Sequence, residues 1–97
     1  MNEINFSVVR KSIIERIVAF EKSLPEEYEV VASVSGLEMV LESVGEVQDF
    51  FFEFKGVSLD HFAPIQIYIK CSDLLLTLSA QPLPVNQVPK RRPIFFG

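Results

Sequence analysis

The hydrophobic period of the chain changes at Pro25, and this change limits the fold more than any other feature. Before Pro25, apolar residues recur every three or four positions, which is typical of one face of an α-helix. After it, apolar and polar residues alternate from Tyr28 to Val57, which is typical of β-strands. A helix followed by a run of strands predicts an α+β domain, with the helix packed on one face of an antiparallel sheet.

The segment before Pro25 predicts one amphipathic helix over residues 5–24. Asn5 or Ser7 can cap its first turn, and Pro25 disfavours helical geometry at the residue before it. The spacing of four, four, three and four places five apolar residues on one face: Val9, Ile13, Ile17, Phe20 and Leu24.

Four strands are expected between Tyr28 and Lys70. Ser35-Gly36 tolerates positive φ and predicts a tight hairpin between the first two strands. Gly45 and residues 46–49 predict the second turn. The third strand should cover residues 50–57, with Phe50, Phe52 and Phe54 on one face, and the fourth should place Ile65, Ile67 and Ile69 on one face.

Residues 71–81 are ambiguous between a fifth strand and a short helix capped by Ser72, and we favour the strand. From Pro82 the chain carries four prolines in twelve residues, which excludes a helix or a central strand. We therefore expect one α+β domain over residues 1–81, with a meander of four or five strands, and an extended Pro-rich tail over residues 82–97.

The second face of the expected sheet is not uniformly polar, because the alternation places four apolar residues on it: Val31, Val40, Val44 and Phe51. The mean hydropathy of +0.28 is also high for a soluble domain of 97 residues. Large exposed apolar areas usually mark binding surfaces. Both features favour a homodimer, or a tail that folds back over this face.

Charge is unevenly distributed along the chain. Of nine Lys and Arg residues, six precede residue 90, together with all thirteen carboxylates, which gives residues 1–89 a charge of −7. Lys90, Arg91 and Arg92 raise the total to −4. An acidic body repels phosphate backbones, so we expect no nucleic-acid partner.

The sequence also argues against a membrane protein. No stretch reaches the roughly 18 apolar residues of a membrane span, and the acidic N-terminus does not resemble a secretory signal. The lone Cys71 cannot form an intrachain disulfide. We expect a cytoplasmic location.

Few residues suggest catalysis or metal binding. His61 follows Asp60, but no patterned nucleophile accompanies this pair. His61, Cys71 and Asp73 lack the spacing of metal ligands, and Cys71 at the end of an apolar strand is expected to be buried and inert. We therefore expect no enzymatic activity, with no catalytic residues, cofactor or metal.

The closing segment Lys90–Gly97 combines three cations with an apolar Ile-Phe-Phe. Burial of each large apolar side chain is worth roughly 1.5–3 kcal/mol, which favours docking over disorder. We favour docking on the protein's own assembly, with a foreign partner and a disordered end as alternatives. The expected partner-binding residues are Lys90, Arg91, Arg92, Ile94, Phe95 and Phe96.

The order of these features resembles a small bacterial family of unknown function. The shared features are Phe20 with Leu24, the acidic turn Glu26-Glu27, Glu29-Val30, Phe54-Lys55-Gly56, Leu74-Leu75-Leu76, and the tail Arg91-Arg92-Pro93-Ile94-Phe95-Phe96. The resemblance implies the same fold and tail but no activity. The family's Gln-His pair and Gln near the last strand are replaced here by Ile69-Lys70 and Asp73.

Together, these observations predict a non-enzymatic protein–protein interaction module that forms a homodimer, with its tail docked on its own assembly. An alternative is a small adaptor or inhibitory protein, of the phage or immunity type, that presents an acidic face to a basic partner. The surfaces expected to bind are the second sheet face and the tail for the homodimer, and the acidic body for the alternative.

Overall fold

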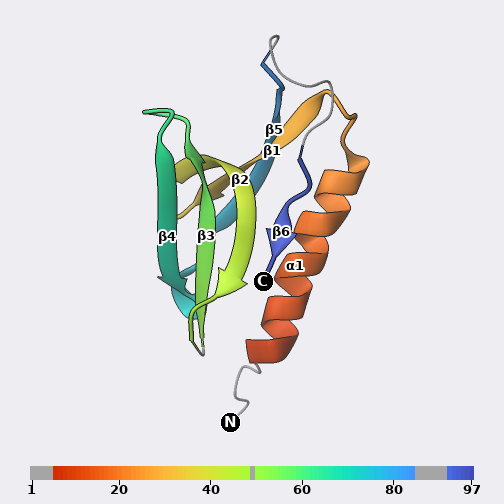
Figure 1. The fold of residues 1–97 in the computed structure, drawn as a ribbon. Helices are drawn as coiled ribbons and strands as arrows, with labels where there is room; N and C mark the ends of the chain where they lie inside the picture. The colour runs from red at the N-terminus through yellow and green to blue at the C-terminus, as the bar shows by residue number, and fades with distance from the viewer. Residues whose placement is uncertain (1–5, 49, 85–91) are drawn as a thin grey trace.

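A computed structural model describes residues 6–48, 50–84 and 92–97. One helix lies beside an antiparallel sheet that curves around the core (Figure 1). The predicted α+β class, with an N-terminal helix packed on the sheet, is confirmed.

Helix α1 spans Phe6–Ser23, within one residue of the predicted bounds. Ile17, at the centre of the predicted apolar face, is fully buried. The N–H of Leu24 donates to the carbonyl of Glu21 at 3.2 Å, which tightens the last turn before the proline. Half-buried residues of the same face pack against the core: Ile13, Phe20 and Leu24.

Strands β1 (Tyr28–Val34) and β2 (Leu37–Glu46) form the predicted hairpin. The two turn residues, Ser35 and Gly36, have φ angles of 49° and 92°. Positive φ at both positions matches the right-handed twist of the flanking strands. The hairpin prediction is confirmed at its predicted residues.

Strand β3 (Phe51–Ser58) starts one residue later than predicted, because β2 continues through Gly45 and moves the turn. Phe50 lies in this turn with a φ of 71° and is 50% exposed. The prediction that Phe50 shares the buried face of Phe52 and Phe54 was therefore wrong.

The sheet has the strand order β4-β3-β2-β1-β5. β1 to β4 (Pro64–Lys70) follow one another as a meander, whereas β5 (Leu76–Pro82) pairs with the far edge of β1. A 3₁₀ turn at Cys71–Asp73 lies in the five-residue connection, 71–75. Such a short segment reaches the opposite edge only because the sheet curls strongly.

The last strand, β6 (Phe95–Phe96), runs parallel to β2. β1 pairs with the first part of β2, up to Val40, and β6 pairs with Ser43 and Val44 further along it. In Figure 1, β6 lies between β2 and α1. The end of the described chain thus extends the sheet where β1 leaves β2.

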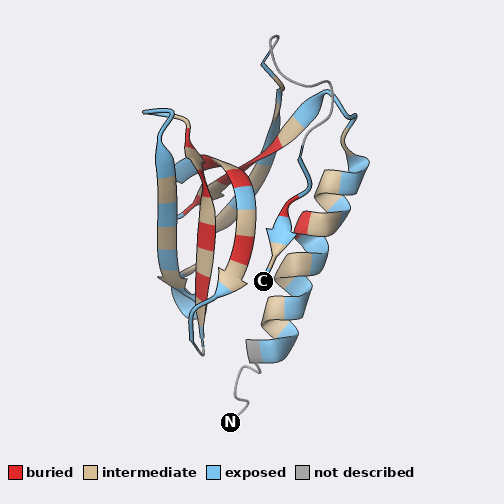
Figure 2. Cartoon of the chain, in the orientation of Figure 1, coloured by how far each residue is buried: buried red, intermediate tan, exposed pale blue. Residues whose placement is uncertain are grey.

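The core lies between the curved sheet and α1, as the buried segments in Figure 2 show. Its largest fully buried side chains are Phe52, Phe54, Ile17, Met39, Val34 and Val44. The register of β2 against β3 shifts between Leu41 and Ser43, and this irregularity turns Val44 toward the core. The prediction that Val44 lies on the outer face was therefore wrong.

The outer face is less open than the sequence suggested. Val31 is only 3% exposed, and Val40 and Phe51 are half-buried. This face therefore offers a smaller apolar surface than the one on which the predicted homodimer was based.

Candidate functional site

The structure places four of the six predicted partner-binding residues. Lys90 and Arg91 lie outside the described residues. Arg92 is exposed, Ile94 is 8% exposed within the core cluster, and Phe95 is 69% exposed. Phe96 is half-buried against the core. In this apolar segment, Ile94 is therefore buried in the core, whereas the ring of Phe95 is exposed to solvent.

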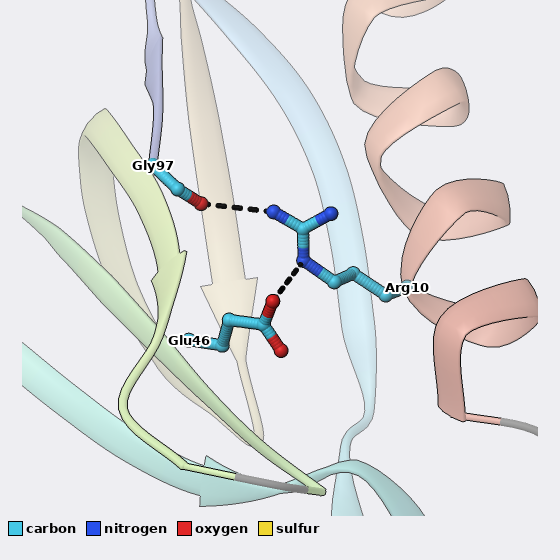
Figure 3. Close-up of polar contacts among 3 residues, drawn as sticks. All are labelled: Arg10, Glu46 and Gly97. Atoms are coloured by element: carbon cyan, nitrogen blue, oxygen red, sulfur yellow. Dashed lines mark hydrogen bonds and ion pairs between the residues drawn. The ribbon is translucent and has the colours of Figure 1, made fainter.

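Polar contacts hold residues 92–97 between α1 and β2. The N–H of Ile94 donates to Glu21 Oε2 at 3.1 Å, and the N–H of Gly97 donates to the carbonyl of Val44 at 2.9 Å. The guanidinium of Arg10 donates to the carbonyl of Gly97 at 2.9 Å and forms an ion pair with Glu46 at 3.0 Å (Figure 3). One arginine therefore links the helix, β2 and the closing segment.

The other residues singled out in the sequence form no reactive constellation. His61 is exposed in the loop between β3 and β4. Burial raises the pKa of the half-buried Cys71 thiol, which disfavours its reactive thiolate form. Across residues 6–48, 50–84 and 92–97, no three His, Cys, Asp or Glu residues are grouped so that they could hold a metal ion.

A small polar group lies on the outer face of β3 and β4. Lys55 and Glu53 form an ion pair at 3.4 Å, and the hydroxyl of Tyr68 donates to Gln66 at 3.0 Å. The pKa of Tyr68 is raised mainly by hydrogen bonding to Glu53, which favours the protonated phenol, and to a smaller extent by burial and by the negative charge of the same carboxylate. These groups are surface-exposed or half-buried, and none of them lines the groove between α1 and β5.

The described surface also carries a groove of about 670 Å³ between the first half of α1 and β5. The helix contributes one flank because its apolar residues recur at helical spacing, and β5 contributes the other because its leucines alternate. The apolar lining consists of Val8, Val9, Ile13, Leu74, Leu76 and Leu78, and the polar lining of Ser12 and Arg16.

Beside the groove, the backbone of β5 presents a free edge. The N–H of Ser35 donates to the carbonyl of Leu75 at 2.8 Å, and the N–H of Leu83 donates to the carbonyl of Glu27 at 2.7 Å. In an antiparallel ladder, inward-bonding residues alternate with residues whose backbone groups point to the other side. The backbone N–H and C=O groups of Leu76, Leu78 and Ala80 therefore point away from β1. No strand in the described part of the chain pairs with this edge.

Three exposed apolar side chains lie on α1 and near the start of β5. Val8 on α1 is 64% exposed and Leu75 is 70% exposed. Leu37 is 51% exposed and belongs to the same cross-strand row as Leu76, since both pair with Val34. Exposed apolar surface often marks interaction sites. Of these three residues, Val8 lines the groove.

The groove and the edge strand are nearly free of charge. The sequence contains no Asp, Glu, Lys or Arg from Leu74 to Pro89, and Arg16 is the one charged residue that lines the groove. Natural edge strands usually carry charges that block pairing with another chain. Our sequence reasoning did not identify this surface, although the uncharged run around the predicted fifth strand was a usable signal.

In the described part of the chain, no helix is both long enough and apolar enough to span a membrane. Comparisons with models of protein families, with curated proteins and with solved structures gave no significant match. The resemblance to a bacterial family therefore stays a prediction, and any function has to be inferred from the geometry of the chain itself.

Proposed function

We propose that the protein is a non-enzymatic protein–protein interaction module that acts as a homodimer through the α1–β5 groove. The observation that carries this proposal is the apolar groove beside an uncharged strand edge. An edge of this kind is a template for pairing with another chain. Its neighbouring leucines supply the apolar surface that makes such pairing favourable in water.

The charge distribution supports self-association at this place. The chain carries a net charge of −4, so two copies repel each other over most of their surfaces. No carboxylate lines the groove, and none occurs in β5. This surface therefore brings two acidic copies together with the least electrostatic cost.

The closing segment belongs to the same assembly in this proposal. Its anchor Ile94 sits in the core of its own chain, and Arg10 fixes Gly97 beside β2. The segment thus holds α1 against the sheet, and α1 in turn supplies one flank of the groove. The tail stabilises the surface through which the two copies bind.

The positions of the titratable groups support a non-enzymatic role. His61, the sequence's only histidine, is exposed in a loop and does not line the groove. Acid–base catalysis needs a positioned group within hydrogen-bond reach of a bound substrate. The groove instead offers apolar side chains, one serine and one arginine.

Light scattering on purified protein tests this proposal with one double variant and one control. Val8→Lys with Ser12→Lys places two cations at exposed positions that line the groove, so the fold should survive and the dimer should dissociate. Phe62→Lys changes a side chain that is 81% exposed in the β3–β4 loop and should leave the dimer mass unchanged. A wild-type protein with monomer mass at high concentration would overturn the proposal, as would a double variant that stays dimeric.

A further inference from the structure

No described strand pairs with the outer edge of β5, and the outward-pointing backbone groups along this edge are arranged symmetrically about Leu78. Outward-pointing backbone groups belong to Leu76, Leu78 and Ala80, at equal spacing on either side of Leu78. We propose that two copies of the chain join through antiparallel β5–β5 pairing, with the two-fold axis passing Leu78. This inference rests on the proposed homodimer and specifies its geometry.

Hydrogen bonding selects this register from the alternatives. With the axis at Leu78, Leu76 lies opposite the second copy's Ala80, and the two Leu78 residues lie opposite each other. All three outward N–H groups of each copy then find a carbonyl acceptor, which gives six bonds from two copies. An axis at Thr77 places the carbonyl of Ala80 opposite the second copy's Leu74, whose N–H already donates to the carbonyl of Cys71. An axis at Ser79 places the carbonyl of Leu76 opposite the second copy's Pro82, which has no N–H. Either alternative leaves one carbonyl of each copy unpaired, and unpaired backbone groups are costly once buried.

Side-chain sizes agree with the same register. Leu76 lies beside the second copy's Ala80, so a large side chain meets a small one at each end of the ladder. Pro82 falls opposite the second copy's Leu74, at the end of the pairing, where its missing N–H removes no bond. Leu76, Leu78 and Ala80 all lie on the face that carries the groove, since Leu76 and Leu78 line it. The two grooves therefore become continuous across the axis.

Charge also favours a second copy at β5 over pairing at the other sheet edge. A two-fold axis brings each residue near its own copy, so any charge at the axis meets a like charge. β5 has the sequence Leu-Thr-Leu-Ser-Ala-Gln-Pro and carries none. The opposite edge strand, β4, begins at Pro64 and ends at Lys70, which are two features that discourage edge pairing.

Disulfide trapping with single cysteines tests the register. In a Cys71→Ser background, Leu78→Cys should form a cross-linked dimer under mild oxidation. Directly paired residues have Cα atoms about 5.5 Å apart, which is within disulfide reach. Leu76→Cys alone and Ala80→Cys alone should stay uncross-linked, because each lies four residues from its own copy, about 13 Å along the strand.

A mixture of the Leu76→Cys and Ala80→Cys proteins should cross-link to each other, which tests the same register if Leu78→Cys fails to fold. Cross-linking of Leu76→Cys alone or of Ala80→Cys alone would overturn the proposed axis. A wild-type dimer that yields neither the Leu78→Cys product nor the mixed product would overturn this inference and leave the homodimer standing. A wild-type protein that is monomeric throughout would overturn both, and would point to an extended segment of another protein as the occupant.

Discussion

Gly56 shows how closely the strands approach each other inside the curved sheet. A Cβ atom built at this position would collide with the carbonyl oxygen of Val40 and lie 3.2 Å from Met39 Sδ. Gly56 pairs with Leu41, immediately before the register shift in β2. The strand therefore needs a residue without a side chain at this point.

Gly56→Ala should lower the free energy of unfolding by about 1–3 kcal/mol, because the added methyl group forces the backbone of β2 to move. The matched control is Gly45→Ala, whose Cβ would meet only the carbonyl oxygen of Gly97 at 3.9 Å. Urea denaturation of both variants measures the difference. Equal stabilities for the two variants would contradict the close packing of β2 and β3.

At the residue scale, the sequence predicted those positions whose chemistry is local. Ser35-Gly36 was predicted correctly because positive φ is a property of the two residues themselves. Phe50 and Val44 were assigned to the wrong faces because strict alternation assumes an unbroken register. The shift between Leu41 and Ser43 leaves no mark in the sequence that we could read.

Among the elements, β6 contributes more to the fold than its two residues suggest. It pairs with β2, and Ile94 just before it enters the core cluster. The backbone N–H of Ile94 is also held by Glu21 of α1. The closing segment therefore joins the helix to the sheet.

Ile94→Ala should lower the free energy of unfolding by about 2–4 kcal/mol, because it leaves a cavity in the core. The control is Phe95→Ala, which removes a larger side chain that is 69% exposed and should change stability by less than about 0.5 kcal/mol. Urea denaturation of the two variants checks the ranking. If Phe95→Ala were the more destabilising change, the segment would be packed differently from the geometry described above.

The elements themselves could be predicted, whereas some of their partners could not. Helix α1 and the strands β1 to β4 follow from hydrophobic periodicity. Periodicity does not specify which edge a strand joins, so the pairing of β5 with β1 was not foreseen. A two-residue strand such as β6 has no period at all, and its parallel pairing depends on tertiary packing.

For the whole molecule, the sequence indicated an uncovered apolar surface but misplaced it. The outer sheet face exposes less apolar surface than predicted, since Val31 is buried and Val44 belongs to the core. The uncovered apolar surface lies instead in the groove between α1 and β5. The uncharged run from Leu74 to Pro89 indicates one flank of the groove, but the groove itself depends on the crossing of residues 71–75 to the far edge of the sheet, which the sequence does not specify.

The β5 surface also differs from the rest of the molecule in its lack of charged side chains. The charge of −4 is distributed over residues outside the run from Leu74 to Pro89. A dimer formed at β5 keeps the acidic groups of the two copies at its periphery. The proposed self-association through β5 is therefore the central claim of this account.

Sedimentation velocity of the full chain and of Ala80→Pro tests this property most directly. The N–H of Ala80 points away from β1, so proline removes a bond to the second copy without removing one within the chain. We predict that the wild-type protein sediments as a dimer and that Ala80→Pro sediments as a folded monomer. A folded Ala80→Pro protein that remains dimeric, or a wild-type protein that is monomeric at every concentration, would contradict the account.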